Sequence, residues 1–282
     1  MQAQWNPSGF GFGGFSVTEL VKAFTNLASH RHLRENHWRV GLWQTDVILG
    51  VGGPAGSRCR LARKTSRIGK VLCGLGALVV AVAATGCAAP QFTYVADGSA
   101  NTYFKVPYGW HKISRSSLAA QFNSSGNVFG RNGSWDVAYD AASAPTATHL
   151  FSGIASEPFA FAFVAPLSES GSNAMSYNGL RDVMLPVTLQ ARATAVRARF
   201  PLTGFRLLRD NRLSLSQGVH GVRDTFDYTY PGGITDTFDQ VALTNSDSTV
   251  LYVLQMHCLA SCYSQNQREI NTIMSSFTVR SP

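Results

Sequence analysis

The sequence of 282 residues predicts an α/β protein built around an antiparallel sheet. Segments with strand-like alternation and segments with helical periodicity follow one another from residue 102 to residue 279. Four of the strand-like segments are consecutive, between residues 205 and 258, and short turns join them. Because turns of a few residues join only antiparallel neighbours, these four strands are expected to form a meander.

The first predicted elements lie between residues 102 and 141. Residues 102–114 are rich in aromatic and β-branched side chains, and Pro107 and Gly109 break this strand pair in the middle. The pieces that follow are a helical turn at 116–122, a polar and glycine-rich loop at 123–134, and an alternating strand at 135–141.

Residues 158–167 are predicted to form a strand with two different faces. Three rings lie on one face and two small side chains on the other, namely Phe159, Phe161 and Phe163 against Ala160 and Ala162. A face of small residues indicates that a neighbour packs closely over it.

Residues 178–200 show the clearest helical periodicity. Leu180, Val183, Met184 and Val187 recur at spacings of three and four, and Pro186 is expected to kink or split the helix. In the second half the arginines lie away from the alanines, as in a helix that covers a sheet; these are Arg192, Arg197 and Arg199 against Ala191, Ala195 and Ala198.

The consecutive strands are placed at 205–215, 219–230, 234–244 and 248–258. Turns are predicted at Pro231-Gly232-Gly233 and at Asn245-Ser246-Asp247-Ser248. Both faces of the fourth strand are apolar apart from Gln255 and His257, so that strand should be central. A helix at 263–275 and a short strand at 276–279 complete the predicted elements.

This order of elements resembles the PsbP-like family, whose members include many actinobacterial lipoproteins of unassigned role. The segments that show the resemblance are YFKVPYGWHKIS at 103–114, STVLYVLQMHC at 248–258 and REINTIMSSFTV at 268–279. The likeness extends over most of residues 91–280 and implies an α/β/α sandwich around a central antiparallel sheet. It implies an assembly or accessory role and no catalytic residues.

Residues 58–87 have the order of parts of a secretion signal. Residues 58–70 contain six basic residues and no acid, residues 71–86 are uncharged and mostly apolar, and Thr85-Gly86-Cys87 follows. This end resembles the lipobox of bacterial lipoproteins, which implies that Cys87 becomes the lipid-modified first residue of the mature chain. An ordinary cut near Ala88 or Ala89, or an uncleaved anchor, remains the alternative, although the apolar run is short for a membrane span.

The signal predicts a division of the chain. Residues 1–60 are expected to be a non-native or disordered extension, because translation from Leu61 would give a signal peptide of ordinary length at 61–86. Residues 87–92 form a short tether and residues 93–282 the PsbP-like domain. The histidines of the extension, His30, His32 and His37, have no cysteine or carboxylate framework around them, so a metal site there is disfavoured.

The charge of the chain excludes nucleic acid as a partner. The net charge is +8, but residues 1–86 hold 10 basic and 3 acidic residues, so +7 of it lies in the extension and the signal. The mature part has a net charge of +1, and a nucleic-acid-binding domain needs a basic face.

The motifs of common enzyme classes are absent from the sequence, including G-x-S-x-G, S-x-x-K, H-E-x-x-H and phosphate-binding glycine loops. Asp224, Asp227, Asp236 and Asp239 lie on adjoining strands and are candidates for an acid and base pair. However, Asp224 and Asp227 should point to opposite faces of a regular strand, as should Asp236 and Asp239. Catalysis is therefore disfavoured.

Two other groups are candidates for binding. Trp110 with Tyr103, Phe104 and Tyr108 would make an aromatic platform, but core packing is the favoured interpretation. His257, Cys258 and Cys262 would make three metal ligands. A disulfide between Cys258 and Cys262 is favoured, because these are the cysteines left in an oxidising compartment after Cys59 and Cys73 leave with the signal and Cys87 takes lipid.

The sequence therefore predicts a lipid-anchored, extracytoplasmic binding or accessory domain on the outer face of the cell membrane. No cofactor or metal is expected, and the expected partners are the membrane, through the lipid, and a protein that the sequence does not identify. The alternatives are a secreted or anchored hydrolase, and a carrier of a lipid or small apolar ligand with a cavity between the strand at 158–167 and the helix at 178–200.

Overall fold

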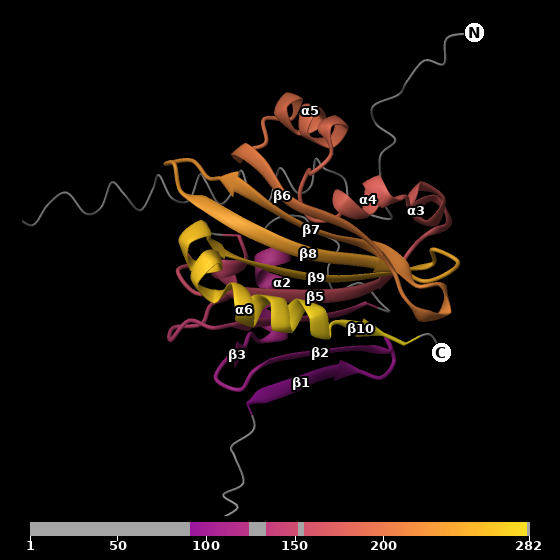
Figure 1. Ribbon diagram of the computed structural model, residues 1–282, viewed down its shortest axis with the longest axis horizontal. Helices are drawn as coiled ribbons and strands as arrows, with labels where there is room; N and C mark the ends of the chain where they lie inside the picture. The colour runs from indigo at the N-terminus through magenta and orange to yellow at the C-terminus, as the bar shows by residue number, and fades with distance from the viewer. Residues whose placement is uncertain (1–90, 124–133, 152–154, 281–282) are drawn as a thin grey trace, which may run out of the picture. The chain divides into compact units, whose positions relative to one another are not determined.

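The computed structural model describes residues 91–123, 134–151 and 155–280, all of which belong to one structural unit. Two antiparallel sheets form its framework (Figure 1). In spatial order, the larger sheet consists of β3 (His111–Lys112), β4 (Trp135–Asp140), β5 (Phe159–Pro166), β9 (Val250–Leu259), β8 (Thr235–Thr244), β7 (His220–Thr229) and β6 (Thr203–Ser214). The smaller sheet consists of β1 (Phe92–Asp97), β2 (Thr102–Pro107) and β10 (Thr278–Val279).

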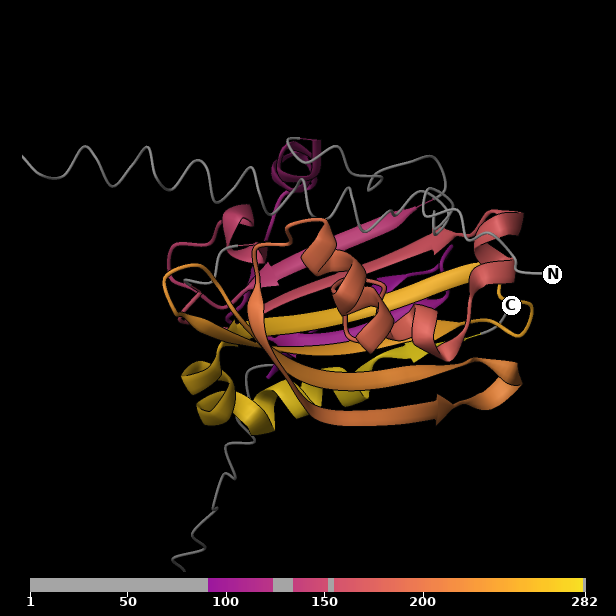
Figure 2. The same ribbon diagram turned by 90° about the horizontal axis from the view of Figure 1, so that it is seen from above.

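Helices cover both faces of the larger sheet, as Figure 2 shows. On one face lie α2 (Arg115–Asn123), the short helix η2 (Ala147–Leu150), α3 (Glu169–Ala174) and α4 (Tyr177–Arg181). On the other lies α6 (Ala260–Ser276), beside the smaller sheet. The helices α5 (Leu189–Arg197) and η3 (Ser216–Gly218) flank β6 in the chain. The fold is thus α/β with a large antiparallel sheet between helical layers, as the sequence predicted.

The predicted meander is confirmed by β6, β7, β8 and β9, which pair in sequence order. The turn between β7 and β8 requires glycine, because Gly232 and Gly233 have φ values of +99° and +83°. β9 is the central strand of the larger sheet, with β5, β4 and β3 on one side and β8, β7 and β6 on the other, and both of its faces are buried, as predicted.

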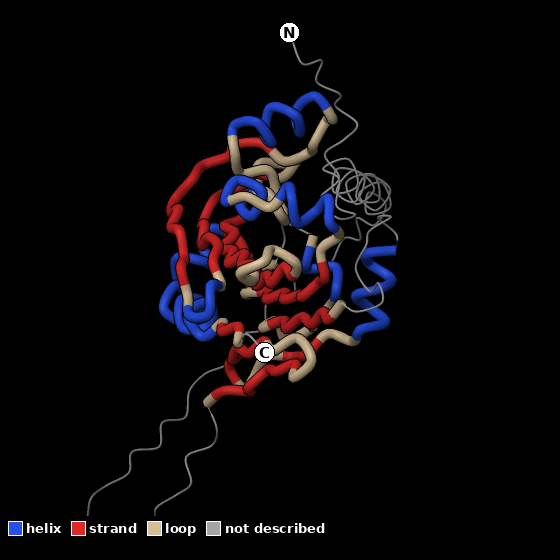
Figure 3. The backbone as a smooth tube through the Cα atoms, turned by 90° about the vertical axis from the view of Figure 1, so that its right-hand side faces the viewer, coloured by secondary structure: helices blue, strands red, loops and turns tan. Residues whose placement is uncertain are grey.

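Two hydrophobic cores lie against the two faces of the larger sheet. The α4-side core contains the rings of β5 together with Leu180 and Phe226, and the α6-side core contains Ala160 and Ala162 together with Ile270 and Phe104. The alanine face of β5 is therefore covered closely by the small sheet and α6, as its small side chains indicated. Figure 3 shows the strands stacked between the helices.

The helical segment predicted at 178–200 is split, as Pro186 indicated, but the break is a loop and not a kink. Helix α4 ends at Arg181, residues 182–188 form a loop, and α5 begins at Leu189. Asp182 stabilises this loop, because its carboxylate accepts hydrogen bonds from the backbone N–H groups of Val187 and Thr188, each at 2.8 Å. Three of the apolar residues at helical spacing, Val183, Met184 and Val187, are instead buried in this loop, which also contains Pro186.

Helix α5 does not lie flat on the sheet as expected. Ala195 is its one buried residue, whereas Leu189 and Val196 are 75% and 77% exposed. Arg192 does not point away from the sheet, since its guanidinium carbon lies 4.2 Å from the centre of the Phe205 ring.

The segment at 102–114 is divided between the sheets, because β2 pairs with β1 while β3 pairs with β4. Strand β1 was not predicted, and the final strand joins β2 in the smaller sheet.

The loop at 124–133 and residues 1–90, with the predicted signal and extension, lie outside the described residues. Among the described helices, none is long and apolar enough to cross a membrane.

Candidate functional site

A row of buried polar side chains crosses the four strands of the meander. Asp210, Asp224, Gln240 and Gln255 are direct cross-strand partners in β6, β7, β8 and β9. Asp224 and Gln240 are completely buried and Gln255 is 3% exposed. All three lie on the α4 side of the sheet, because the residues two positions away on the same strands, Phe226, Phe238 and Val253, belong to the α4-side core. We call this set the polar row.

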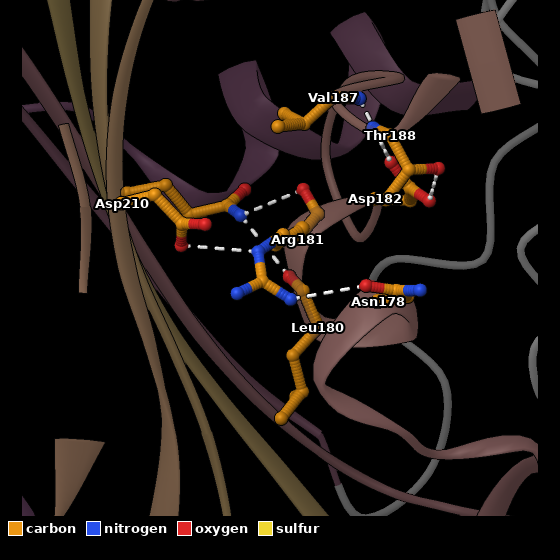
Figure 4. Close-up of polar contacts among 8 residues, drawn as sticks. Asn178, Leu180, Arg181, Asp182, Val187, Thr188 and Asp210 are labelled. Atoms are coloured by element: carbon orange, nitrogen blue, oxygen red, sulfur yellow. Dashed lines mark hydrogen bonds and ion pairs between the residues drawn. The ribbon is translucent and has the colours of Figure 1, made fainter. Parts of the chain in front are cut away.

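Helix α4 contacts the polar row, and Figure 4 shows its residue Arg181 beside Asp210. The amide nitrogen of Gln240 donates to the backbone carbonyl oxygens of Leu180 at 3.1 Å and Arg181 at 3.2 Å. The guanidinium of Arg181 donates to Asp210 at 3.0 Å and to the side-chain oxygen of Asn178 at 3.0 Å. The last turn of this short helix is therefore fixed by the row beneath it.

Asp224 is the unusual member of the row. Neither of its carboxyl oxygens has a hydrogen-bond partner in the described structure. Burial raises its pKa well above the ordinary value, and the nearby charge of Asp210 adds to this increase, while Arg181 opposes it. The side-chain oxygen of Gln240 also lacks a donor. Protonated Asp224 can supply that donor, so the row fits a neutral carboxylic acid.

Two of the candidate aspartates, Asp227 on β7 and Asp239 on β8, face the α6 side of the sheet. Their carboxylates accept hydrogen bonds from arginine and hydroxyl groups. Asp239 accepts from Arg223 at 2.7 and 2.9 Å and from the hydroxyl of Tyr263 at 2.8 Å. Asp227 accepts from Arg206 at 2.6 Å and from Thr237 at 2.7 Å. These bonds stabilise the sheet and leave neither carboxylate available as a catalytic base.

Asp236 shares the α4 face with Asp224 but belongs to a separate pair. Its carboxylate lies 3.4 Å from Nδ1 of His257, and the imidazole is stacked on Phe238 with ring centroids 5.2 Å apart. The prediction that Asp224 and Asp227 point to opposite faces, as do Asp236 and Asp239, is therefore confirmed. The strands do not bring the four carboxylates together.

A second histidine and aspartate pair was missed by the sequence analysis. Asp140 at the end of β4 is completely buried, and His149 Nδ1 lies 2.7 Å from its carboxylate. The same carboxylate accepts from the backbone N–H groups of Ala142 and Thr146. These bonds hold the loop after β4, and the nine-residue separation of the pair gives no recognisable motif.

An open cleft of about 580 Å³ lies where the turn after β1 approaches the strands β4, β5 and β9. We call it the edge cleft; its lining includes Asp97, Asn101, Arg115, Trp135, Asn245 and Tyr252. The hydroxyl of Ser99 is the largest influence on Asp97 and lowers its pKa, and backbone N–H groups and Arg115 act in the same direction. Arg115 donates to Asp136 at 3.2 Å and to the carbonyl of Ser134 at 3.3 Å.

Sequence reasoning missed the edge cleft, because its lining comes from residues 97 to 252 and only the folded strands bring them together. Its chemistry is that of a binding site. Asp97 remains an ionised acceptor, Arg115 offers donors, and Trp135 and Tyr252 supply aromatic surface. The volume lies within the range of ligand pockets, about 300–1,000 Å³.

The four aromatic residues proposed as a platform do not form one. Phe104 is buried and packs edge-on against Trp135, Tyr139 and Phe277. Trp110 packs against the α6-side core, as the favoured interpretation predicted for it. The core packing favoured for Tyr103 and Tyr108 is wrong, since Tyr108 is 67% exposed and the guanidinium carbon of Arg280 lies 5.1 Å from the centre of the Tyr103 ring at the surface.

Cys258 and Cys262 are joined by a disulfide, with Cα atoms 5.9 Å apart. The bond links the end of β9 to the first turn of α6, in the turn where the sequence predicted it. His257 faces the opposite core, so the three residues do not converge as metal ligands. No group of three possible ligands was found among the described residues, and Cys87 lies outside them.

No family model matches the chain, and no curated protein matches it. Solved structures do match. Cyanobacterial PsbP from Synechocystis is 13% identical, with 74% of this chain and 99% of that chain covered and a TM-score of 0.40. A PsbP protein is thus among the matched structures, as the sequence resemblance predicted.

Two further matches come from other organisms. LpqN of Mycobacterium tuberculosis, described as involved in cell envelope biogenesis, is 16% identical, with 68% of this chain and 91% of that chain covered and a TM-score of 0.38. The Ran-binding protein Mog1p of Saccharomyces cerevisiae is 10% identical, with 67% and 95% covered and a TM-score of 0.38. These similarities concern the fold, and we transfer no function from them.

Proposed function

We propose that the protein is a lipid-anchored, extracytoplasmic domain that acts by binding a partner or ligand and not by catalysis. The observation that supports binding is the edge cleft. Its two oppositely charged side chains, Asp97 and Arg115, are surrounded by aromatic and amide groups, and the residues described around it include no histidine, cysteine or lysine. A cleft of this kind offers hydrogen bonds and apolar contact, but no acid and base pair.

The anchor is supported by where the fold begins. Strand β1 starts at Phe92, five residues after Cys87, so the folded domain follows the predicted lipid site almost directly. The disulfide between Cys258 and Cys262 supports an oxidising compartment outside the cytoplasm.

The two alternatives lack comparable support. A carrier needs a cavity between β5 and the segment after α4, but Leu180, Val183 and Leu185 pack into the same core cluster as the rings of β5. A hydrolase needs convergent reactive groups, and the four candidate aspartates are divided between separate partners.

The anchor is tested by metabolic labelling with an alkyne fatty acid. Wild type and a Cys73→Ser control should be labelled and should float with membranes, whereas Cys87→Ser should lose the label. Biotinylation of intact cells at the exposed Lys112 should mark the wild type. Equal labelling of Cys87→Ser, or a protein protected from biotin in intact cells, would contradict the proposal.

Binding is tested by placing a photo-crosslinking amino acid in the cleft. We expect an adduct when it replaces Arg115, whose side chain is 63% exposed, and none when it replaces the exposed Arg197 on α5. Identical results at the two positions would mean that the cleft is not the binding site.

A further inference from the structure

The outer face of the smaller sheet combines aromatic rings with cations. We define this aromatic–cationic face by Phe92, Tyr94, Tyr103, Lys105, Tyr108 and Arg280. Along β1 and β2, the side chains of Phe92, Tyr94, Tyr103 and Lys105 alternate with Val95, Phe104 and Val106, which are buried in the α6-side core, and Tyr108 directly follows the end of β2. Tyr94 is 80% exposed and Tyr108 is 67% exposed. No other described element covers these two rings.

The charged side chains on this face, Lys105 and Arg280, are both positive. The ammonium of Lys105 lies 4.3 Å from the centre of the Phe92 ring, and the guanidinium of Arg280 lies 5.1 Å from the centre of the Tyr103 ring. The acid of these strands, Asp97, lies at the opposite end of β1 from Phe92, and its carboxylate accepts hydrogen bonds from Ser99 and Ala100. The face is therefore cationic beside its exposed rings.

The chain enters the fold at this face. The carbonyl of Gln91 accepts a hydrogen bond of 3.0 Å from the backbone N–H of Tyr108, so the segment that follows Cys87 joins the sheet beside that ring. Five residue steps separate Cys87 from Phe92 and span at most about 18 Å when fully extended. A lipid on Cys87 would hold this part of the domain within that distance of the bilayer.

We propose that the aromatic–cationic face docks on the headgroup region of an anionic bilayer. This proposal rests on the lipid anchor proposed above. Tyrosine rings are enriched at the membrane interface, where an apolar ring and a polar hydroxyl are both accommodated. Lys105 and Arg280 add electrostatic attraction to anionic headgroups. Docking would hold the domain in one orientation on the membrane, whereas the tether alone would leave it free to rotate.

The test measures which side of the anchored protein meets the lipid. Ala96→Cys places a thiol on the outer face of β1 without removing a residue of the aromatic–cationic face, and Ala193→Cys places a matched one on α5. Figure 1 shows α5 and β1 at opposite ends of the described fold. Each thiol receives an environment-sensitive fluorophore, and the lipidated protein is reconstituted into phosphatidylcholine vesicles with or without phosphatidylglycerol.

We expect a blue shift of the label at 96, and none at 193, in vesicles that contain phosphatidylglycerol. Replacing Lys105 and Arg280 together by glutamine should weaken docking about thirtyfold, or about fivefold for each cation. Replacing Tyr94 and Tyr108 by serine should also weaken docking on the vesicles that contain phosphatidylglycerol. An Arg197→Gln variant on α5 is the control for lost positive charge.

Flotation of the vesicles separates the two proposals. A protein that does not float overturns the anchor and this inference together. A protein that floats, with both labels in an aqueous environment or shifted equally, overturns docking alone. Self-association of the protein through this face would shift the label at 96 without any dependence on phosphatidylglycerol, and that result would also overturn docking on the bilayer.

Discussion

Asp224→Asn should make the protein more stable at neutral and alkaline pH. Asp224 is completely buried and its carboxyl oxygens have no hydrogen-bond partner in the described structure. Its folded-state pKa is raised, chiefly by burial and then by Asp210, with Arg181 acting against them and Asp239 with them. Asparagine has the same shape and never takes the charge, so it removes the cost of ionising the carboxyl inside the fold.

The sign of the pH dependence follows from the direction of this shift. Between the unfolded pKa, about 3.9, and the raised folded pKa, the folded protein holds one proton more than the unfolded chain. The stability of the wild type therefore falls with rising pH across this window, by up to about 1.4 kcal/mol per pH unit. The contribution of Asp224 to stability is fully present below the unfolded pKa. The asparagine variant lacks this dependence.

The measurement is urea unfolding of both proteins from pH 4 to pH 9. The difference in free energy of unfolding should be small at pH 4 and should grow in favour of the variant as pH rises. Asp239→Asn is the matched control, since Asp239 is equally buried but bonded to Arg223 and Tyr263. It should cost about 3 kcal/mol or more. A difference between wild type and Asp224→Asn that does not change with pH would refute a neutral Asp224.

The remaining predictions concern stability. Removing the disulfide by replacing Cys258 and Cys262 with alanine should lower the free energy of unfolding by no more than about 2 kcal/mol, because the closed loop is short; two free thiols in the unreduced mature protein would show that the bond does not form. Gly221→Ala should cost about 1–3 kcal/mol, because the new Cβ would lie 2.0 Å from the carbonyl oxygen of Ala242. Gly98→Ala is its control, since that Cβ would meet no atom within 4 Å, and equal urea midpoints for the two variants would contradict the reasoning.

The sequence predicted the elements that depend on local patterns. The meander follows from alternation and turn residues such as Gly232 and Gly233, which need positive φ. A break at Pro186 was predicted, but the extent of the loop at 182–188 was not, because its apolar spacing is the same as that of a helix. Contacts distant in sequence decide its structure, among them the hydrogen bond from the hydroxyl of Tyr228 to the carbonyl of Pro186. Periodicity alone contains no information about such contacts.

The candidate sites were predictable only in part. The alternation of side chains along a strand predicted that Asp224 and Asp227 lie on opposite faces, because this prediction requires the sequence of one strand only. Predicting the polar row also requires the register between strands, which sets Asp224 opposite Gln240 and Gln240 opposite Gln255. Predicting the edge cleft requires the packing of the smaller sheet against the larger one, and the spacing of residues in the sequence does not specify that packing.

The polar row links the protonation of Asp224 to the position of α4. Gln240 holds the last turn of α4 through two backbone carbonyls, and its own oxygen needs a donor that a neutral Asp224 can supply. Arg181, in the same turn, pairs with Asp210. With Asp224 neutral, one guanidinium balances one carboxylate. With Asp224 ionised, two carboxylates that are direct cross-strand partners would repel each other, and Gln240 would have to turn its amide nitrogen from α4 toward Asp224. Both effects would loosen α4, so the helix is most firmly held when Asp224 keeps its proton.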